Sequence, residues 1–81
     1  MNVVLNQVVP NSSDYTLTLS YSGGEIRVFD VKPYLDKGVF KELRNKQIFN
    51  SVHISNGTVE WQNGQDFCPD TLYCKSVEVK K

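Results

Sequence analysis

The chain begins with alternating apolar and polar residues, which predict two antiparallel strands. Residues 15–21 alternate without interruption, as expected for a strand with one face on a core and the other in water. The side chains on its apolar face are Tyr15, Leu17, Leu19 and Tyr21. Residues 22–24 carry two glycines and predict a tight turn, because glycine accepts positive φ. Residues 25–31 form the return strand. The alternation of apolar residues changes phase between Val28 and Phe29. This indicates either a β-bulge or a strand that is buried on both faces near its end.

A second hairpin is predicted further along the chain. Asn56-Gly57 separates the alternating segments 51–54 and 58–61, and Asn-Gly is a dipeptide that two-residue hairpin turns prefer. Two weaker strand signals lie near the ends of the sequence. Residues 3–9 are apolar and β-branched and end at a proline, and residues 77–79 alternate enough to predict either a short strand or a frayed end.

Near-helical spacing of apolar residues occurs in the middle of the chain. The residues in this pattern are Leu35, Val39, Phe40 and Leu43, with charged side chains facing away. Because Gly38 interrupts the pattern, we predict one turn at residues 33–36 and a short helix from about Val39 to Arg44. A later helix start is predicted at Pro69, since proline suits the first helical position.

These elements predict an α+β fold: a small, mostly antiparallel sheet of about five strands, one central helix and a short C-terminal helical turn. At 81 residues, the sequence predicts a single domain spanning residues 1–81, because two domains would leave neither enough material for a core.

Charge and composition exclude several classes of protein. Nine basic and nine acidic residues cancel, so we expect no direct nucleic-acid binding, which depends on a positive field. No signal peptide and no apolar stretch of membrane-spanning length is visible. Cys68 and Cys74 are too few for a disulfide framework, so reduced thiols and a cytoplasmic location are expected.

Residues 61–73 gather the most chemically special side chains. Asp66 and Asp70 stand four apart and could form an acid–base pair or bind a hard cation. The structural alternative is that Asp66 caps a turn and Asp70 stabilises a helix N-terminus. Two carboxylates fall short of the roughly six to eight oxygens that calcium takes, so the structural alternative is favoured.

Cys68 also has a functional and a structural interpretation. A thiol at a helix start can act as a nucleophile, but the base would have to be His53, which lies on a predicted strand. A buried, inert cysteine is the favoured interpretation. Cys68, Cys74 and His53 together are fewer than the four ligands of structural zinc, so neither a metal nor a cofactor site is expected.

The aromatic residues of this region carry two interpretations. They are Trp61, Tyr73, Tyr34 and Phe67, and they could line a pocket or anchor an interface. In so small a domain they more often form the core. The candidate interaction or pocket surface is Trp61, Asn63, Asp66, Asp70 and Tyr73.

The chain resembles the bacterial domain-of-unknown-function family 2442 along nearly its whole length. The matching motifs are Asp14-Tyr15-Thr16-Leu17, residues 24–30, 33–36, 38–43 and 57–61, and the run Asn63-Gly64-Gln65-Asp66-Phe67-Cys68-Pro69-Asp70-Thr71-Leu72-Tyr73. The departures, Gly23 and Gln62, both lie in predicted turns. The resemblance implies a small α+β domain, found alone or fused to a helix-turn-helix domain. It also implies a gene arrangement like that of toxin–antitoxin pairs.

Three functions follow from this sequence. We favour a non-catalytic module, not an enzyme, that binds another small protein or associates with itself, because no catalytic set is complete. The first alternative is a small enzyme or ligand sensor that uses Asp66, Cys68, Asp70 and His53. The second alternative is an accessory domain of a DNA-binding regulator, which rests on the fused relatives alone.

Overall fold

A computed structural model describes residues 3–79 of the chain, as an α+β fold. The strands are β1 (Leu5–Asn11), β2 (Thr16–Tyr21), β3 (Ile26–Asp30), β4 (His53–Ser55), β5 (Thr58–Glu60) and β6 (Val77–Glu78). The α-helices are α1 (Lys46–Phe49) and α2 (Pro69–Lys75), and the 3-10 helices are η1 (Ser22–Gly24), η2 (Lys32–Tyr34) and η3 (Gly38–Arg44).

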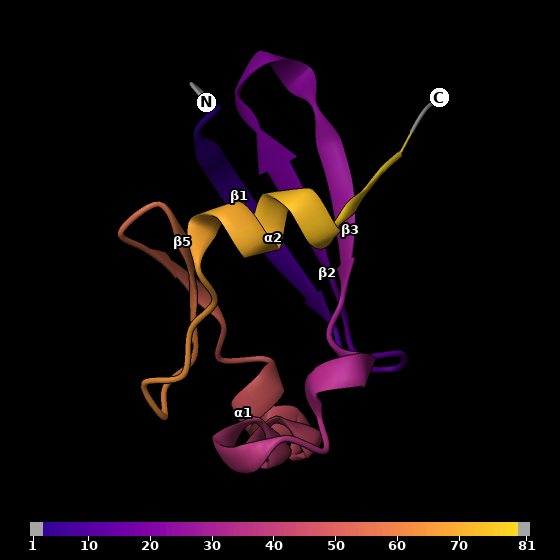
Figure 1. Cartoon of the computed structure of the whole chain (residues 1–81), viewed down its shortest axis with the longest axis vertical. Coiled ribbons are helices and arrows are strands. Elements are labelled where there is room, and N and C mark those ends of the chain that lie inside the picture. Colours follow the sequence, from indigo (N-terminus) through magenta and orange to yellow (C-terminus); the bar gives the residue numbers. More distant parts are fainter. Residues whose placement is uncertain (1–2, 80–81) are drawn as a thin grey trace.

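A four-stranded antiparallel sheet, in the order β1-β2-β3-β6, forms one layer of the molecule. Leu17 and Leu19 of β2 are fully buried, whereas the hydroxyl residues that alternate with them are half-buried on the other face. This confirms the alternation expected from the sequence. Helix α2 crosses the apolar face of the sheet (Figure 1) and buries Leu72 against it. The opposite face of the sheet has no helix over it in that view.

The irregularities of the sheet differ from those predicted. The β2–β3 register is continuous through Val28 and Phe29, so the bulge considered there is absent, and the two side chains point to opposite faces. The bulge lies instead in β1, between Leu5 and Gln7. Pro10 does not end β1 but lies within it, which an edge strand tolerates because one side of its backbone needs no partner.

The predicted second hairpin is confirmed and forms a separate two-stranded sheet, β4-β5. Asn56 and Gly57 make its turn with φ of 53° and 81°, the left-handed region that these residue types accept most readily. The tail adds β6, so the described chain holds six strands in two sheets rather than about five in one.

A short helix is present where the sequence predicts one, from about Val39 to Arg44. Residues 38–44 form a 3-10 helix, in which positions three apart share a face. Phe40 is half-buried and Leu43 is fully buried, as this spacing requires, whereas Val39 is exposed. Asn45 then breaks the helix with extended backbone, and its side chain accepts a hydrogen bond from the Gln47 amide to begin α1.

Aromatic rings fill the core between the sheet, the hairpin and the 3-10 helices. Phe67 lies at their centre, with ring centroids 4.8 Å from Phe29, 5.0 Å from Tyr34 and 4.9 Å from Phe40. Among the described residues, none of the helices combines the length and apolar character needed to cross a bilayer.

Candidate functional site

Trp61 belongs to the core and not to the surface. Its side chain is 1% exposed, and its Nε1 donates a hydrogen bond to the Phe49 carbonyl at 2.9 Å. Its ring also packs edge-on against Phe67, with centroids 5.8 Å apart. The only polar atom of the indole therefore already has a hydrogen-bond partner, and it is not free to bind a ligand.

The turn after Trp61 is capped by Asn63 and not, as the sequence analysis proposed, by Asp66. Asn63 Oδ1 accepts from the Gln65 amide at 3.0 Å, and its Nδ2 donates to the Glu42 side chain at 2.9 Å. The Asp66 backbone bridges to Glu60, while its side chain is exposed. This turn is thus fixed to η3 and continues the β4-β5 sheet.

Asp70 and Tyr73 meet at a small cavity beside α2. The cavity has a volume of about 100 Å³ and is lined by Pro69, Asp70, Tyr73 and Cys74 of α2, with Val3, Tyr21 and Gly57 from other segments. Asp70 lies in the first turn of α2, as predicted, and is exposed. Two of the predicted surface residues are therefore brought together, and the rest lie elsewhere.

The other candidate catalytic residues do not join them at this cavity. Cys68 is exposed just before α2, so its predicted burial is wrong. His53 lies at the far end of the β4-β5 hairpin from the Gly57 turn, where its Nε2 is 3.4 Å from Glu60 Oε1. Among the described residues, no group of three or more His, Cys, Asp or Glu side chains could hold a metal ion.

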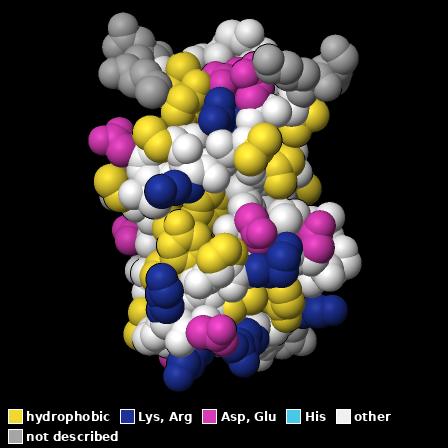
Figure 2. All heavy atoms as spheres, turned by 45° about the vertical axis from the view of Figure 1, so that its right-hand side comes forward, with side chains coloured by type: hydrophobic (Ala, Val, Ile, Leu, Met, Phe, Trp, Pro, Cys, Tyr) yellow, Lys and Arg dark blue, Asp and Glu magenta, His cyan; other side chains and the backbone are white. Residues whose placement is uncertain are grey.

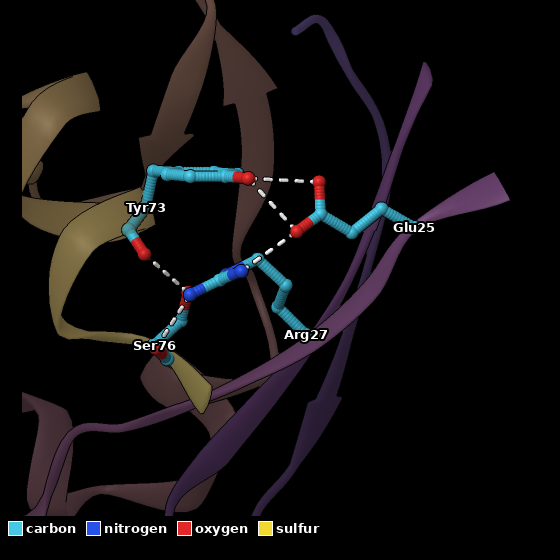
Figure 3. A network of polar contacts seen from close by, with 4 residues as sticks. All are labelled: Glu25, Arg27, Tyr73 and Ser76. Carbon is cyan, nitrogen blue, oxygen red and sulfur yellow. Dashed lines mark hydrogen bonds and ion pairs between the residues drawn. The ribbon is translucent and has the colours of Figure 1, made fainter. Parts of the chain in front are cut away.

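A polar network, which the sequence did not predict, fixes α2 to the sheet (Figure 3). Arg27 donates to Glu25 at 2.7 Å and to the Ser76 carbonyl and hydroxyl at 2.9 and 2.6 Å. The Tyr73 hydroxyl donates to the Glu25 carboxylate at 2.8 Å, and the Arg27 guanidinium lies 4.2 Å from the centre of the Tyr73 ring. Every charged atom of the network has a partner inside it.

The network changes the acidity of its members. The Tyr73 hydroxyl, followed by Arg27, lowers the pKa of Glu25 below its ordinary value by bonding to the carboxylate. The same hydrogen bond raises the pKa of Tyr73, and burial raises the pKa of Tyr21 beside it. Glu25 therefore stays ionised and Tyr73 stays protonated across the neutral range. Glu25 and Arg27 lie two residues apart on one strand, so the sequence indicates that they are neighbours. No local pattern indicates that Tyr73, 48 residues after Glu25, bonds to them.

Charges are mixed on the face that Figure 2 shows. Figure 2 turns the β3 side of the molecule forward and shows acidic, basic and apolar side chains interspersed, without a broad area of one charge. This distribution agrees with the net charge of zero.

Comparison with protein-family models decides the relationship of the chain. The model described as "Protein of unknown function (DUF2442)" matches residues 7–78. The chain belongs to this family. The resemblance seen in the sequence is thereby confirmed, and DUF2442 membership spans every strand and helix from β2 to β6. The comparisons with curated proteins and with solved structures give no match.

Proposed function

We propose that this DUF2442 protein is a non-catalytic protein-binding module whose α2 cavity receives a side chain of another small protein. The observation that carries the proposal is the size of the cavity, about 100 Å³. Small-molecule sites usually measure about 300–1,000 Å³, and a dry cavity of about 150 Å³ holds one benzene. A volume of this size suits one inserted side chain.

The placement of the reactive groups supports a binding role over an enzymatic one. Asp70 and Cys74 line the cavity, but His53 lies at the other end of the hairpin. A nucleophile needs a base within hydrogen-bond reach. Asp70 is the one carboxylate among the described residues that line the cavity, and none of them is a histidine. The carboxylate of the polar network, on the half-buried Glu25, is already bonded to Tyr73 and Arg27.

The surrounding charge indicates the kind of partner. Among the described residues, Asp70 is the one charged side chain that lines the cavity. We propose that the partner carries basic residues around the side chain that enters the cavity, because complementary rim charges speed association and select partners.

The test uses two exposed cysteines as a matched pair. The tagged chain is expressed in its native host, any protein recovered in stoichiometric amount is purified, and its affinity is measured for wild type, Cys74→Tyr and Cys68→Tyr. Cys74 lines the cavity and Cys68 does not, although both are exposed. We expect Cys74→Tyr to weaken binding at least about tenfold, which corresponds to one well-packed side chain, and Cys68→Tyr to bind like wild type.

Two results would contradict the proposal. Recovery of the bait alone would leave the module without a protein partner. Equal affinity of both variants would place the partner on another surface. Circular dichroism and thermal unfolding of each variant verify that the fold is kept.

A further inference from the structure

The two tyrosines that line the cavity beside α2 differ in what their hydroxyls bond. The Tyr73 hydroxyl donates to the Glu25 carboxylate at 2.8 Å (Figure 3). Tyr21 packs edge-on against Tyr73, with ring centroids 5.0 Å apart, and is 6% exposed. Among the described residues, the tyrosine hydroxyls that make hydrogen bonds are those of Tyr15 and Tyr73. The Tyr21 hydroxyl therefore has no protein partner within residues 3–79, although Tyr21 is more than nine-tenths buried.

This hydroxyl opens into the cavity. In the described part of the chain, every wholly buried side-chain oxygen has a partner, so the Tyr21 hydroxyl is in contact with accessible space. The cavity that Tyr21 lines is that space. Burial raises the pKa of Tyr21, so its hydroxyl stays protonated at neutral pH and is available as a hydrogen-bond donor. The cavity thus combines a buried donor with the exposed carboxylate of Asp70.

A buried donor without a protein partner restricts what can fill the cavity. An occupant that ends in apolar atoms would displace water from the hydroxyl and leave it unbonded, which costs more than an ordinary hydrogen bond contributes. Sites that hold such a polar group therefore reject analogues that lack the matching atom. The occupant has to bring a hydrogen-bond acceptor to Tyr21.

The charges near the cavity favour an acceptor without a charge. Besides burial, the Arg27 guanidinium and the Glu25 carboxylate act on the Tyr21 hydroxyl in opposite senses, and they neutralise each other across 2.7 Å. A carboxylate that entered would be repelled by Asp70 at the rim. Lysine and arginine side chains carry donors and no acceptor, so they cannot accept the hydrogen of Tyr21.

The size and walls of the cavity narrow the choice further. Its volume of about 100 Å³ is smaller than the roughly 150 Å³ of a cavity that holds one benzene, so an aromatic side chain does not fit. Val3 and Pro69 give it apolar walls that suit an aliphatic stem. Serine and threonine carry their oxygen on the first side-chain carbon and offer little stem. Glutamine and asparagine combine a stem with an uncharged carbonyl oxygen.

We propose that the α2 cavity binds a primary carboxamide, supplied by a glutamine or asparagine side chain of the partner. The inference rests on the proposed function and names the side chain that enters. The carboxamide carbonyl accepts a hydrogen bond from the Tyr21 hydroxyl, and the stem packs against Val3 and Pro69. Asp70 at the rim is left for the basic residues that flank this side chain. Tyr21 thus determines which side chain the cavity accepts.

Small probes test this inference without the partner. The isotope-labelled chain is titrated with butyramide, with the butyrate anion of the same shape and with the n-butylammonium cation, each to about 100 mM, and amide chemical shifts are followed. We expect butyramide to shift the amides of Tyr21, Tyr73 and Cys74. Its dissociation constant should be on the order of 10 mM, because so few atoms contribute. Butyrate and n-butylammonium are expected to bind at least about fivefold more weakly.

Two tyrosine variants provide the matched control. Tyr21→Phe and Tyr34→Phe each remove a hydroxyl that has no partner among the described residues, and Tyr21 lines the cavity whereas Tyr34 does not. We expect Tyr21→Phe to weaken butyramide binding at least about fivefold and Tyr34→Phe to bind like wild type. Because neither change removes an internal hydrogen bond, both variants are expected to keep the thermal unfolding midpoint of wild type.

Any of four outcomes would overturn the inference. The first is that butyramide shifts no amide at the cavity, and the second is that butyrate or n-butylammonium binds as tightly. The third is equal binding of butyramide by wild type and Tyr21→Phe. The fourth is a lower unfolding midpoint for Tyr21→Phe alone, which would reveal an internal partner of the hydroxyl.

The cavity proposal and the carboxamide inference can fail separately. Weaker partner binding by Cys74→Tyr without any butyramide binding would keep the cavity as a protein-binding site and overturn the carboxamide. Butyramide binding without a recoverable protein partner would contradict the proposed function and support the carboxamide site.

Discussion

The hydroxyl of Thr58 offers the sharpest test of how the segment after Trp61 is held. Thr58 is 4% exposed, and its Oγ1 donates a buried hydrogen bond to the Phe67 carbonyl at 2.7 Å. This bond fixes the chain immediately before α2 to β5. Thr58→Val keeps the β-branched shape and removes the donor, whereas Thr58→Ser keeps the donor and removes a buried methyl group.

The two variants reverse the order that hydrophobicity alone predicts. Thr58→Val leaves the Phe67 carbonyl without its partner, which costs about 1–3 kcal/mol. Thr58→Ser loses about 0.8 kcal/mol for one buried methyl group. Hydrophobic burial by itself would make the valine variant more stable than wild type. We therefore expect the order wild type, then Thr58→Ser, then Thr58→Val.

Urea unfolding followed by the fluorescence of Trp61, the only tryptophan, measures this order. With a slope of about 1 kcal/mol/M, we expect Thr58→Val to lower the urea midpoint by about 1–3 M and Thr58→Ser by less than about 1 M. In a domain of this size each 1 kcal/mol also lowers Tm by roughly 4–8 °C. A valine variant as stable as wild type would refute the reasoning, because the hydrogen bond would then contribute nothing.

Two further predictions concern pH and thiol reactivity. The pKa of Glu25 is lowered in the folded protein, so folding stability is lost as pH falls from the ordinary value of 4.5 through the lowered folded value. Tyr73→Phe reduces this loss of stability, whereas Tyr15→Phe, which removes a hydrogen bond to a backbone carbonyl, leaves it unchanged. Urea unfolding at pH 3 to 7 measures the free energy of unfolding of both variants. Equal dependence of that free energy on pH in the two variants would contradict the role of Tyr73. Because Cys68 and Cys74 are both exposed, we expect a thiol reagent to modify both rapidly without denaturant, and slow reaction of either would disprove its accessibility.

The hairpins could be predicted from the sequence because their signals are local. Glycine accepts the backbone angles of both turns, with φ of 83° at Gly23 and 81° at Gly57, and alternation indicates the buried face of β2. The helix over residues 39–44 is present, but the apolar pattern does not indicate that it is a 3-10 helix. Apolar residues three and four apart fit an α-helix, but Gly38 before the segment and the extended Asn45 after it leave a 3-10 helix.

Contacts between residues far apart in the sequence have no local signal of this kind. β6 pairs with β3, which lies far earlier in the chain, whereas β4 and β5 pair with each other in a second sheet. The bond between Tyr73 and Glu25 joins residues separated by 48 positions. Cys68 was expected to be buried because free cysteines usually are, yet its place before Pro69 at the start of α2 turns it to solvent. Such contacts come from tertiary packing and not from local pattern.

The segment that best identifies the family acts by position rather than by chemistry. Trp61 and Phe67 pack in the core, and Asn63 bonds within the turn between them. These contacts fix the chain that leads into α2, which crosses the sheet. The cavity therefore lies on the α2 side of the sheet.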